Sequence, residues 1–348
     1  MLRAAWPQVR DNLASTRREA TVFLDGLEHI YGEIGGQSWA ARWTSIGDVH
    51  CALGNLNIEK GGLNEATEAW LCALTAFEVA RRLVDEGDPQ ARDLSTKVEA
   101  VIQRFGYLDR KVEPVQLACD DQSEFVAYYL PAGGRDLCAP AVICISSEEQ
   151  TAATLLGRLL PVVLDRGLSI LVVSHDDVSN HWRGQSEFLL SCCLDYLSAR
   201  PDIDATRMGV YGEGLSAALA TDFALSDRRI AAAVCDGGLW RSARTAASVG
   251  WITKTADAAA EEAVCADRLR SVRQLRCPIL VVAGGRGLVS VSEAIKLQAD
   301  CAGARIDLEL AMPRMTPTPV GQIENFVTSD NSIFDWLEHK LAQTNHCR

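Results

Sequence analysis

The sequence predicts an α/β fold: a mostly parallel sheet with helices on both faces, preceded by a helical domain. Three observations support this prediction. The segment before Val112 has helical periodicity and no strong strand candidate, and two alternating segments follow it. From there to the end, solid apolar runs alternate with helical patterns. Such runs are typical of parallel strands that are buried on both faces.

The composition is that of a globular protein with enough material for one large domain or two. Of the 348 residues, 48% are hydrophobic and 23% are charged, and the net charge is −12. The negative charge argues against nucleic acid or an anionic membrane as a partner. No apolar run is long enough to span a bilayer, and the first residues lack a signal-peptide core, so we expect a cytoplasmic location.

The 12 cysteines show no C-x-x-C pair and no zinc-ligand spacing with histidine. We therefore expect reduced, mostly buried thiols, no metal and no cofactor.

Residues 1–111 are expected to form a helical lid or cap domain, and residues 112–348 the sheet domain. Thr67 to Val84 and Leu94 to Phe105 carry apolar side chains at helical spacing. The composition changes near residue 111 without a flexible linker. This favours a lid that packs against the carboxyl edge of the sheet.

Earlier in the lid, Ser38 is the expected N-cap of a helix that carries Trp39 and Trp43. These two side chains, together with Trp182 from a loop of the sheet domain, are candidates for an aromatic wall of the pocket. The alternative is that the tryptophans simply pack in the core.

In the sheet domain, Val115–Cys119 and Phe125–Leu130 alternate like an antiparallel pair. The expected parallel strands are Ala141–Ile145, Ser169–Val173, Met208–Tyr211, Ile230–Cys235, Ile279–Ala283 and Ile306–Ala311. The expected helices between and after them cover 150–166, 185–199, 215–226, 260–274, 291–302 and 331–343.

The sequence from Arg207 to Ala220 is the stretch that bears most directly on function. A short β-branched and aromatic run ends in small residues and passes at once into an Ala/Leu-rich helix. This is the layout of the nucleophile elbow of α/β-hydrolases, whose pattern is G-x-S-x-G. With Gly212 at the first position, the nucleophile position falls on Gly214. We therefore expect Gly214 at the tip of the turn and Ser216 inside the helix.

Four segments occur in a fixed order along most of the chain: Gly35 to Trp43, the Ala-rich helix at 66–82, the elbow at 209–220 and the Asp335-Trp336-Leu337 helix. In this order they resemble one α/β-hydrolase family, that of the fermentation–respiration switch protein and the dihydroxypseudooxynicotine hydrolase. The resemblance implies an α/β-hydrolase fold with an N-terminal helical lid.

The same resemblance implies a catalytic serine at the elbow, an aspartate after the next-to-last strand and a histidine after the last one. Here the elbow position is Gly214, the loop 283–289 has no carboxylate, and the segment 312–330 has no histidine. All three triad positions are empty on this alignment, which disfavours ordinary Ser-His-Asp hydrolysis.

Two alternatives keep hydrolysis open. The frame can shift so that Ser216 becomes the nucleophile, although its simpler role is that of a small helix-packing residue. Asp236 closes a strand next to the elbow and could orient a base, or it could simply start the Asp-Gly-Gly turn.

His175 is the candidate acid/base. It directly follows an apolar strand, so it should lie at the carboxyl edge of the sheet, and Asp176 could orient its ring or raise its pKa. The alternative is a loop-capping cluster with a surface histidine.

The loop from Ser146 to Glu148 takes the place where the family builds an oxyanion hole. With the N–H of Leu215 it could polarise a substrate carbonyl, and the missing side chain at Gly214 would leave room for the ligand. The alternative for Glu148 is a carboxylate that favours a helix N-terminus.

The favoured function is a cofactor-independent, non-hydrolytic enzyme that acts on a carbonyl-rich small molecule by cyclisation, addition, elimination or isomerisation, in secondary metabolism. One alternative is a ligand-binding pseudoenzyme. Another is an ester or C–C hydrolase that uses Ser216 or a displaced nucleophile. The expected partner is a small-molecule substrate, and the chain is a candidate homodimer.

Overall fold

The computed structural model describes residues 7–29, 36–85, 87–106, 112–118, 124–133, 138–179, 185–237, 275–284, 291–303, 306–318 and 321–343. The expected helix at 260–274 and the candidate residue Trp182 lie outside these ranges. So does most of the loop 283–289.

The N-terminal region is helical, as predicted. Its helices are α1 (Leu13–Asp25), α3 (Gly36–Glu59), α4 (Leu63–Arg81) and α5 (Pro89–Phe105). Among the described residues no strand precedes β1. The predicted N-cap at Ser38 is wrong, because α3 already begins at Gly36 and Ser38 lies within its first turn.

Within the described ranges, the main sheet has eight strands in the order β1-β2-β4-β3-β5-β6-β7-β8. They are β1 (Glu113–Ala118), β2 (Glu124–Leu130), β3 (Ala139–Ile145), β4 (Ser169–Val173), β5 (Ile203–Glu213), β6 (Ile230–Asp236), β7 (Ile279–Val282) and β8 (Leu308–Ala311). β2 runs antiparallel to both β1 and β4, and the pairs from β4 to β8 are parallel. The predicted mostly parallel sheet with an antiparallel pair at its start is confirmed.

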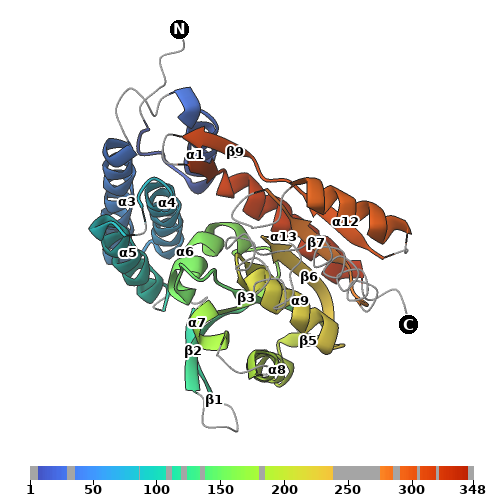
Figure 1. Ribbon diagram of the computed structural model, residues 1–348. Coiled ribbons are helices and arrows are strands. Elements are labelled where there is room, and N and C mark those ends of the chain that lie inside the picture. Colours follow the sequence, from blue (N-terminus) through green and yellow to red (C-terminus); the bar gives the residue numbers. More distant parts are fainter. Residues whose placement is uncertain are drawn as a thin grey trace.

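Helices cover both faces of the sheet (Figure 1). One face packs on α6 (Ala152–Val163) and α13 (Phe326–Gln343), and the other on α8 (Gln185–Ser198), α9 (Ser216–Ser226) and α12 (Val291–Gly303). Alternate residues of a strand divide between the two cores, as the twofold period of a strand requires: Val142 lies in the first and Ile143 in the second.

The helical region extends the first of these cores. α4 and α5 pack on α6, α1 packs on α13, and α3 packs on α4 (Figure 1). The region therefore lies outside the helices that cover one face of the sheet. The region also reaches the carboxyl edge, as we expected, because Asp25 of α1 pairs with Arg314 just beyond the end of β8. Its α4 and α5 helices pack on α6, all of whose residues are buried.

A two-stranded hairpin that the sequence reasoning missed follows β8. Its strands are β9 (Met315–Thr318) and β10 (Gly321–Glu324), and it leads directly into α13. The hairpin contacts α1, where the Thr316 hydroxyl donates a hydrogen bond to the carbonyl of Leu24. Each strand has only four residues, and β9 contains a proline and β10 a glycine, both unfavourable in strands, so neither strand showed an alternating pattern.

No helix within the described part of the chain combines the length and the apolar character needed to cross a membrane.

Candidate functional site

The chain turns sharply between β5 and α9, at the carboxyl end of a central strand. Gly214 forms the tip of this turn with φ +61°, a conformation that favours glycine. A Cβ on Gly212 would lie 2.1 Å from the carbonyl oxygen of Ser216, so strand and helix approach too closely for any larger residue. Ser216 is the first residue of α9 and is fully buried. The predicted positions of Gly214 and Ser216 are confirmed.

The carboxylate of Glu148 lies over the tip of the elbow. Its Oε2 accepts a hydrogen bond from the backbone N–H of Leu215 at 3.0 Å. A Cβ on Gly214 would lie 2.6 Å from the same oxygen, so Glu148 fills space that a side chain at the tip would need. In acyl-transfer enzymes with this elbow, the amide after the nucleophile binds the oxyanion. Here that amide holds an anionic oxygen from the chain itself.

His175 stands beside the elbow as the first residue of α7 (His175–Val178), one residue after β4. Its Nδ1 lies 2.7 Å from the Oγ of Ser216, and the Ser216 hydroxyl donates to the carbonyl oxygen of Ser146 at 2.7 Å. A hydroxyl has one hydrogen, so this network assigns the Nδ1–H tautomer to His175. The lone pair of the ring is therefore on Nε2.

The backbone of the 146–148 loop is held in the same network. The hydroxyl of Ser146, which is fully buried, donates to the carbonyl of Gln150 at 2.7 Å and accepts from the backbone N–H of His175 at 3.1 Å. Ser146 thus ties the end of β3 to the end of β4 and fixes His175 relative to the elbow.

Burial lowers the pKa of His175, whereas the nearby negative charges of Glu148 and Asp176 raise it; the net change is downward. The imidazole is therefore neutral at pH 7 and able to accept a proton at Nε2. Asp176 lies in α7 and is exposed. Its influence on His175 is through its charge.

A buried ionic cluster lies beneath the elbow; we call it the Arg158 cluster. Arg158 on α6 pairs with Glu213 at 2.9 Å, lies 3.5 Å from Asp330 of α13, and donates to the hydroxyl of Tyr211 at 2.8 Å. That hydroxyl lies 3.1 Å from a carboxylate oxygen of Asp236. All five side chains are at most 4% exposed.

Burial, with a further contribution from the charge of Glu324, raises the pKa of Asp236 to about 7, against the opposing effect of Arg158. Burial likewise raises the pKa of Asp330 to about 6. These carboxyl groups share the Arg158 guanidinium, so ionising all of them together is costly.

The role considered for Asp236, orienting a base, does not match its contacts. Its carboxylate accepts a hydrogen bond from Tyr211, whereas the His175 ring bonds Ser216. The reason is strand alternation: Asp236 is two residues from Val234, whose side chain lies in the α6–α13 core, and it is paired in register with Glu213. Its side chain therefore joins the Arg158 cluster.

Trp39 and Trp43 are core residues of the helical region. They are 2% and 0% exposed, and their rings stack edge-on against Phe23 with centroids 5.4 and 5.3 Å apart. Both lie on α3, which packs on α4. The structure thus brings Ser146, Glu148, His175, Gly214 and Leu215 together and leaves the two tryptophans in a separate place.

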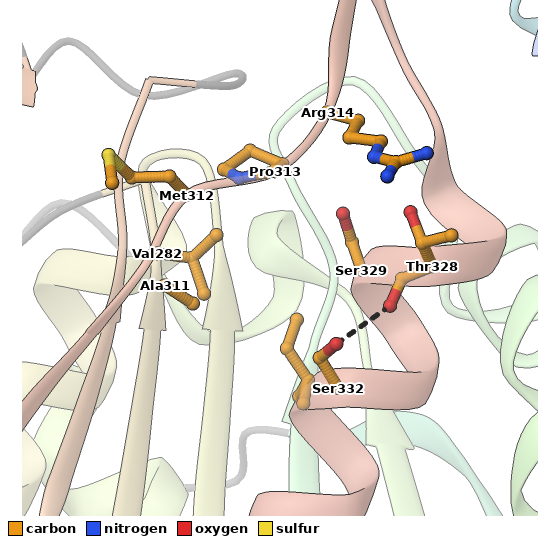
Figure 2. Close-up of a pocket in the computed structure, with 9 residues that line it drawn as sticks. Val282, Ala311, Met312, Pro313, Arg314, Thr328, Ser329 and Ser332 are labelled. Carbon is orange, nitrogen blue, oxygen red and sulfur yellow. Dashed lines mark hydrogen bonds between the residues drawn. The ribbon is translucent and has the colours of Figure 1, made fainter. Parts of the chain in front are cut away.

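A cavity of about 200 Å³ lies farther along the carboxyl edge, between the ends of β7 and β8 and the first turns of α13 (Figure 2). Apolar and polar side chains line it: Val282, Ala311, Met312, Pro313, Arg314, Thr328, Ser329, Ser332 and Ile333. The sequence reasoning missed this cavity because its polar residues come from the unpredicted hairpin connection and the unpredicted first turns of α13.

The Arg158 cluster was also missed, although the sequence carries a signal for it. Arg158 is the only charged residue in the apolar helix Ala152–Val163, and Glu213 ends an apolar strand. A single charge in a buried helix needs a buried partner. Among the described residues, no three His, Cys, Asp or Glu side chains are grouped so that they could hold a metal ion.

Comparison with known proteins identifies the fold. No protein-family model matches the sequence, and no curated protein does. Solved structures do match: the fold is that of the α/β-hydrolases, and the resemblance seen in the sequence is confirmed at this level.

The crystal structure of the 2,6-dihydroxy-pseudo-oxynicotine hydrolase is 18% identical, with a TM-score of 0.59 over 92% of this chain and 95% of that one. AbyA5 is 14% identical, with a TM-score of 0.52 over 95% of this chain and 94% of that one. Likeness at this identity establishes the fold, so the reaction has to be argued from the site.

Proposed function

We propose that this protein is a cofactor-independent enzyme that moves a proton on a small carbonyl compound. The reaction would take place on the side of the elbow where Glu148 and His175 lie, which we call the open side. One arrangement supports the proposal: the Leu215 N–H holds an anionic oxygen, and beside it stands a neutral His175 whose tautomer Ser216 fixes. The Leu215 N–H is suited to stabilise an enolate oxygen, and the neutral imidazole of His175 is suited to remove a proton.

In the proposed reaction the substrate carbonyl oxygen replaces Glu148 Oε2 on the Leu215 N–H. His175 Nε2 removes a proton from the adjacent carbon, and the electron pair left behind forms an enolate whose oxygen the amide stabilises. The displaced Glu148 carboxylate stabilises the imidazolium by its charge. Reprotonation of the enolate gives isomerisation, loss of a group gives elimination, and attack on a second carbonyl gives addition or cyclisation.

Hydrolysis through Ser216 is the second candidate, and its 2.7 Å contact with His175 is the observation that favours it. Two features place it second. Ser216 is fully buried, and its hydroxyl donates to the carbonyl of Ser146, whereas a nucleophilic serine must give its proton to the base. Gly214 at the elbow tip and the lack of histidine in 312–330 support the proposal that the family's triad is not used.

The test uses 5-nitrobenzisoxazole, a probe that opens to a coloured phenolate when a base removes its C–H proton and the N–O bond breaks. We expect turnover by the native protein and a loss of about 10²–10⁴-fold in His175→Ala, with an unchanged circular dichroism spectrum and thermal midpoint. His29→Ala, at an exposed histidine of the helical region, is the matched control and should keep full activity. Full activity in His175→Ala would remove the catalytic assignment.

The pH profile gives a second readout. Because the lowered pKa of His175 still includes an upward contribution from Glu148, the acid limb of the native profile should lie below pH 6.5, and Glu148→Gln should move it to still lower pH. If the acid limb of Glu148→Gln lies at the same pH as that of the native protein, the charge of Glu148 does not affect the pKa of His175.

A fluorophosphonate probe with mass spectrometry separates the rival functions. Labelling of Ser216, together with hydrolysis of p-nitrophenyl acetate, would favour the hydrolase. If Ser216 is not labelled and 5-nitrobenzisoxazole is not turned over, the result would favour a ligand-binding protein.

A further inference from the structure

We infer that the cavity between β7, β8 and α13 is a binding subsite for a monoanionic carboxylate with a small apolar body. The first observation is Ser329, on α13. The residue is 8% exposed, it lines the cavity, and its Oγ has no hydrogen-bond partner among the described residues. A buried hydroxyl without a partner is costly, and a ligand acceptor would satisfy it.

The second observation is Arg314, which follows β8. In Figure 2 its guanidinium lies on the same side of α13 as the Ser329 hydroxyl. One nitrogen, Nη1, pairs with Asp25 of α1 at 2.9 Å, while Nε and Nη2 have no partner within the described ranges. A guanidinium held by one carboxylate keeps donors for a second one, because its fork presents five N–H groups.

The other hydroxyls that line the cavity are already committed. Thr328 donates to the carbonyl of Asn325, and Ser332 donates to the carbonyl of Thr328 (Figure 2). The free donors are thus those of Arg314 and Ser329, one for each oxygen of a carboxylate. A dianion such as phosphate would meet the charge of Asp25, 2.9 Å from the guanidinium, and the described residues that line the cavity include no second cation.

The rest of the wall is apolar, formed by Val282, Ala311, Met312 and Ile333 among others. The volume of about 200 Å³ is below the roughly 300–1,000 Å³ of pockets that enclose drug-sized ligands. The cavity therefore accommodates a short branched acid, or the acidic end of a longer molecule.

The inference that this cavity binds part of the substrate rests on the proposed function. β7 is two strands from β5, and strands are spaced by about 4.8 Å, so the cavity begins about 10 Å from the elbow along the carboxyl edge. A substrate that uses both places is an extended acid, with its carboxylate at Arg314 and its reactive carbonyl at Leu215.

The experiment measures binding directly, without turnover, so that its outcome is independent of the proposed chemistry. 3-Methylbutanoate is titrated against the native protein by ligand-observed NMR, with neutral 3-methylbutanamide as the matched compound. We expect saturable millimolar binding of the acid only. Arg314→Gln should weaken it about 10-fold or more, and Ser329→Ala about 3–10-fold, because charged hydrogen bonds are stronger than neutral ones.

Arg229→Gln is the control, since Arg229 is another partly exposed, ion-paired arginine, placed just before β6 at the opposite edge of the sheet. It should leave binding unchanged. Equal binding of acid and amide, no loss in Arg314→Gln, or no saturable binding by a correctly folded native protein would each overturn the inference. If the native protein binds the acid but does not turn over 5-nitrobenzisoxazole, the result would count against the proposed reaction and not against the binding subsite.

Discussion

Two sets of titratable side chains meet at the elbow, one on each side of a single turn of backbone. On the open side, Glu148 is exposed, and its one hydrogen bond to a described residue is with the N–H of Leu215. His175 keeps one ring nitrogen without a partner in the same described part of the chain. On the closed side, Arg158, Glu213 and their partners are buried and bonded to one another. The backbone N–H of Gly214 donates to the carbonyl of Asp236 at 2.8 Å and joins the two sides.

Burial acts on both sets but with different consequences. It lowers the pKa of His175 and so produces a neutral base at neutral pH. It raises the pKa of Asp236 to about 7 and so keeps a carboxyl group partly protonated in the interior. Groups that exchange protons with a ligand must be accessible to it, whereas groups that only pair with one another can be fully buried. The difference is consistent with the proposed chemistry on the open side and with a stabilising role for the closed side.

The largest expected effect is on the closed side, from Arg158→Met. The substitution keeps much of the side-chain volume but leaves Glu213 and Asp330 buried without their cation. Breaking one partner of a buried ion pair costs about 3–5 kcal/mol, a large part of the roughly 5–15 kcal/mol that stabilises a domain. Urea unfolding at pH 7, followed by circular dichroism, measures the loss.

Arg229→Met is the control for this prediction, because the ion pairs of Arg229 are partly exposed. Its cost should stay below about 1 kcal/mol. If Arg158→Met were no more destabilising than this control, the Arg158 cluster would not be what holds the closed side together.

A smaller effect is expected from Asp236→Asn, and it depends on pH. The pKa of Asp236 is raised when folded, to about 7 from an ordinary value near 4. The native state thus binds a proton that the unfolded chain releases, and this carboxyl group makes stability fall as pH rises from about 4 to 7, by at most about 1.4 kcal/mol per pH unit. The variant should lose part of that slope.

Unfolding free energies at pH 5 and pH 8 provide the measurement for Asp236→Asn. Asp330, whose pKa is raised to about 6, stays in the variant and keeps a slope of the same sign. An unchanged slope would mean that Asp236 ionises in the folded protein as it does in the unfolded chain.

The open side could be predicted from the sequence to a useful degree. The apolar run before Gly212 and the Ala-rich helix after it place Gly214 at the tip, and the strand before His175 places that residue at the carboxyl edge. These are local signals, since each depends on a strand and the residue that follows it. Periodicity reports such positions well.

The closed side and the cavity could not be predicted in the same way. The partner of Arg158 depends on which of two strand faces Glu213 occupies and on where α13 begins, and the sequence placed that helix five residues too late. Likewise, Trp39 and Trp43 have the pattern of pocket residues and of core residues alike, and only the packing of α3 on α4 decides between them.

The smallest effect is expected from Gly214→Ser, which puts the serine of the G-x-S-x-G pattern at the tip and should produce no esterase. The backbone at φ +61° accepts a side chain at a cost of about 1–3 kcal/mol, and the new side chain would displace Glu148, whose Oε2 lies 2.6 Å from the Cβ position. A serine needs a base within hydrogen-bond reach, and the segment 312–330 offers no histidine. Nε2 of His175 is the remaining base nearby, but the ring is held by the bond of Nδ1 to Ser216 and not by a bond to residue 214. Hydrolysis of p-nitrophenyl acetate by Gly214→Ser should therefore equal that of Gly214→Ala, which displaces Glu148 equally but adds no hydroxyl. A rate more than about 10-fold above that control, with fluorophosphonate labelling at position 214, would show that His175 serves a nucleophile at the tip and that the open side still supports hydrolysis.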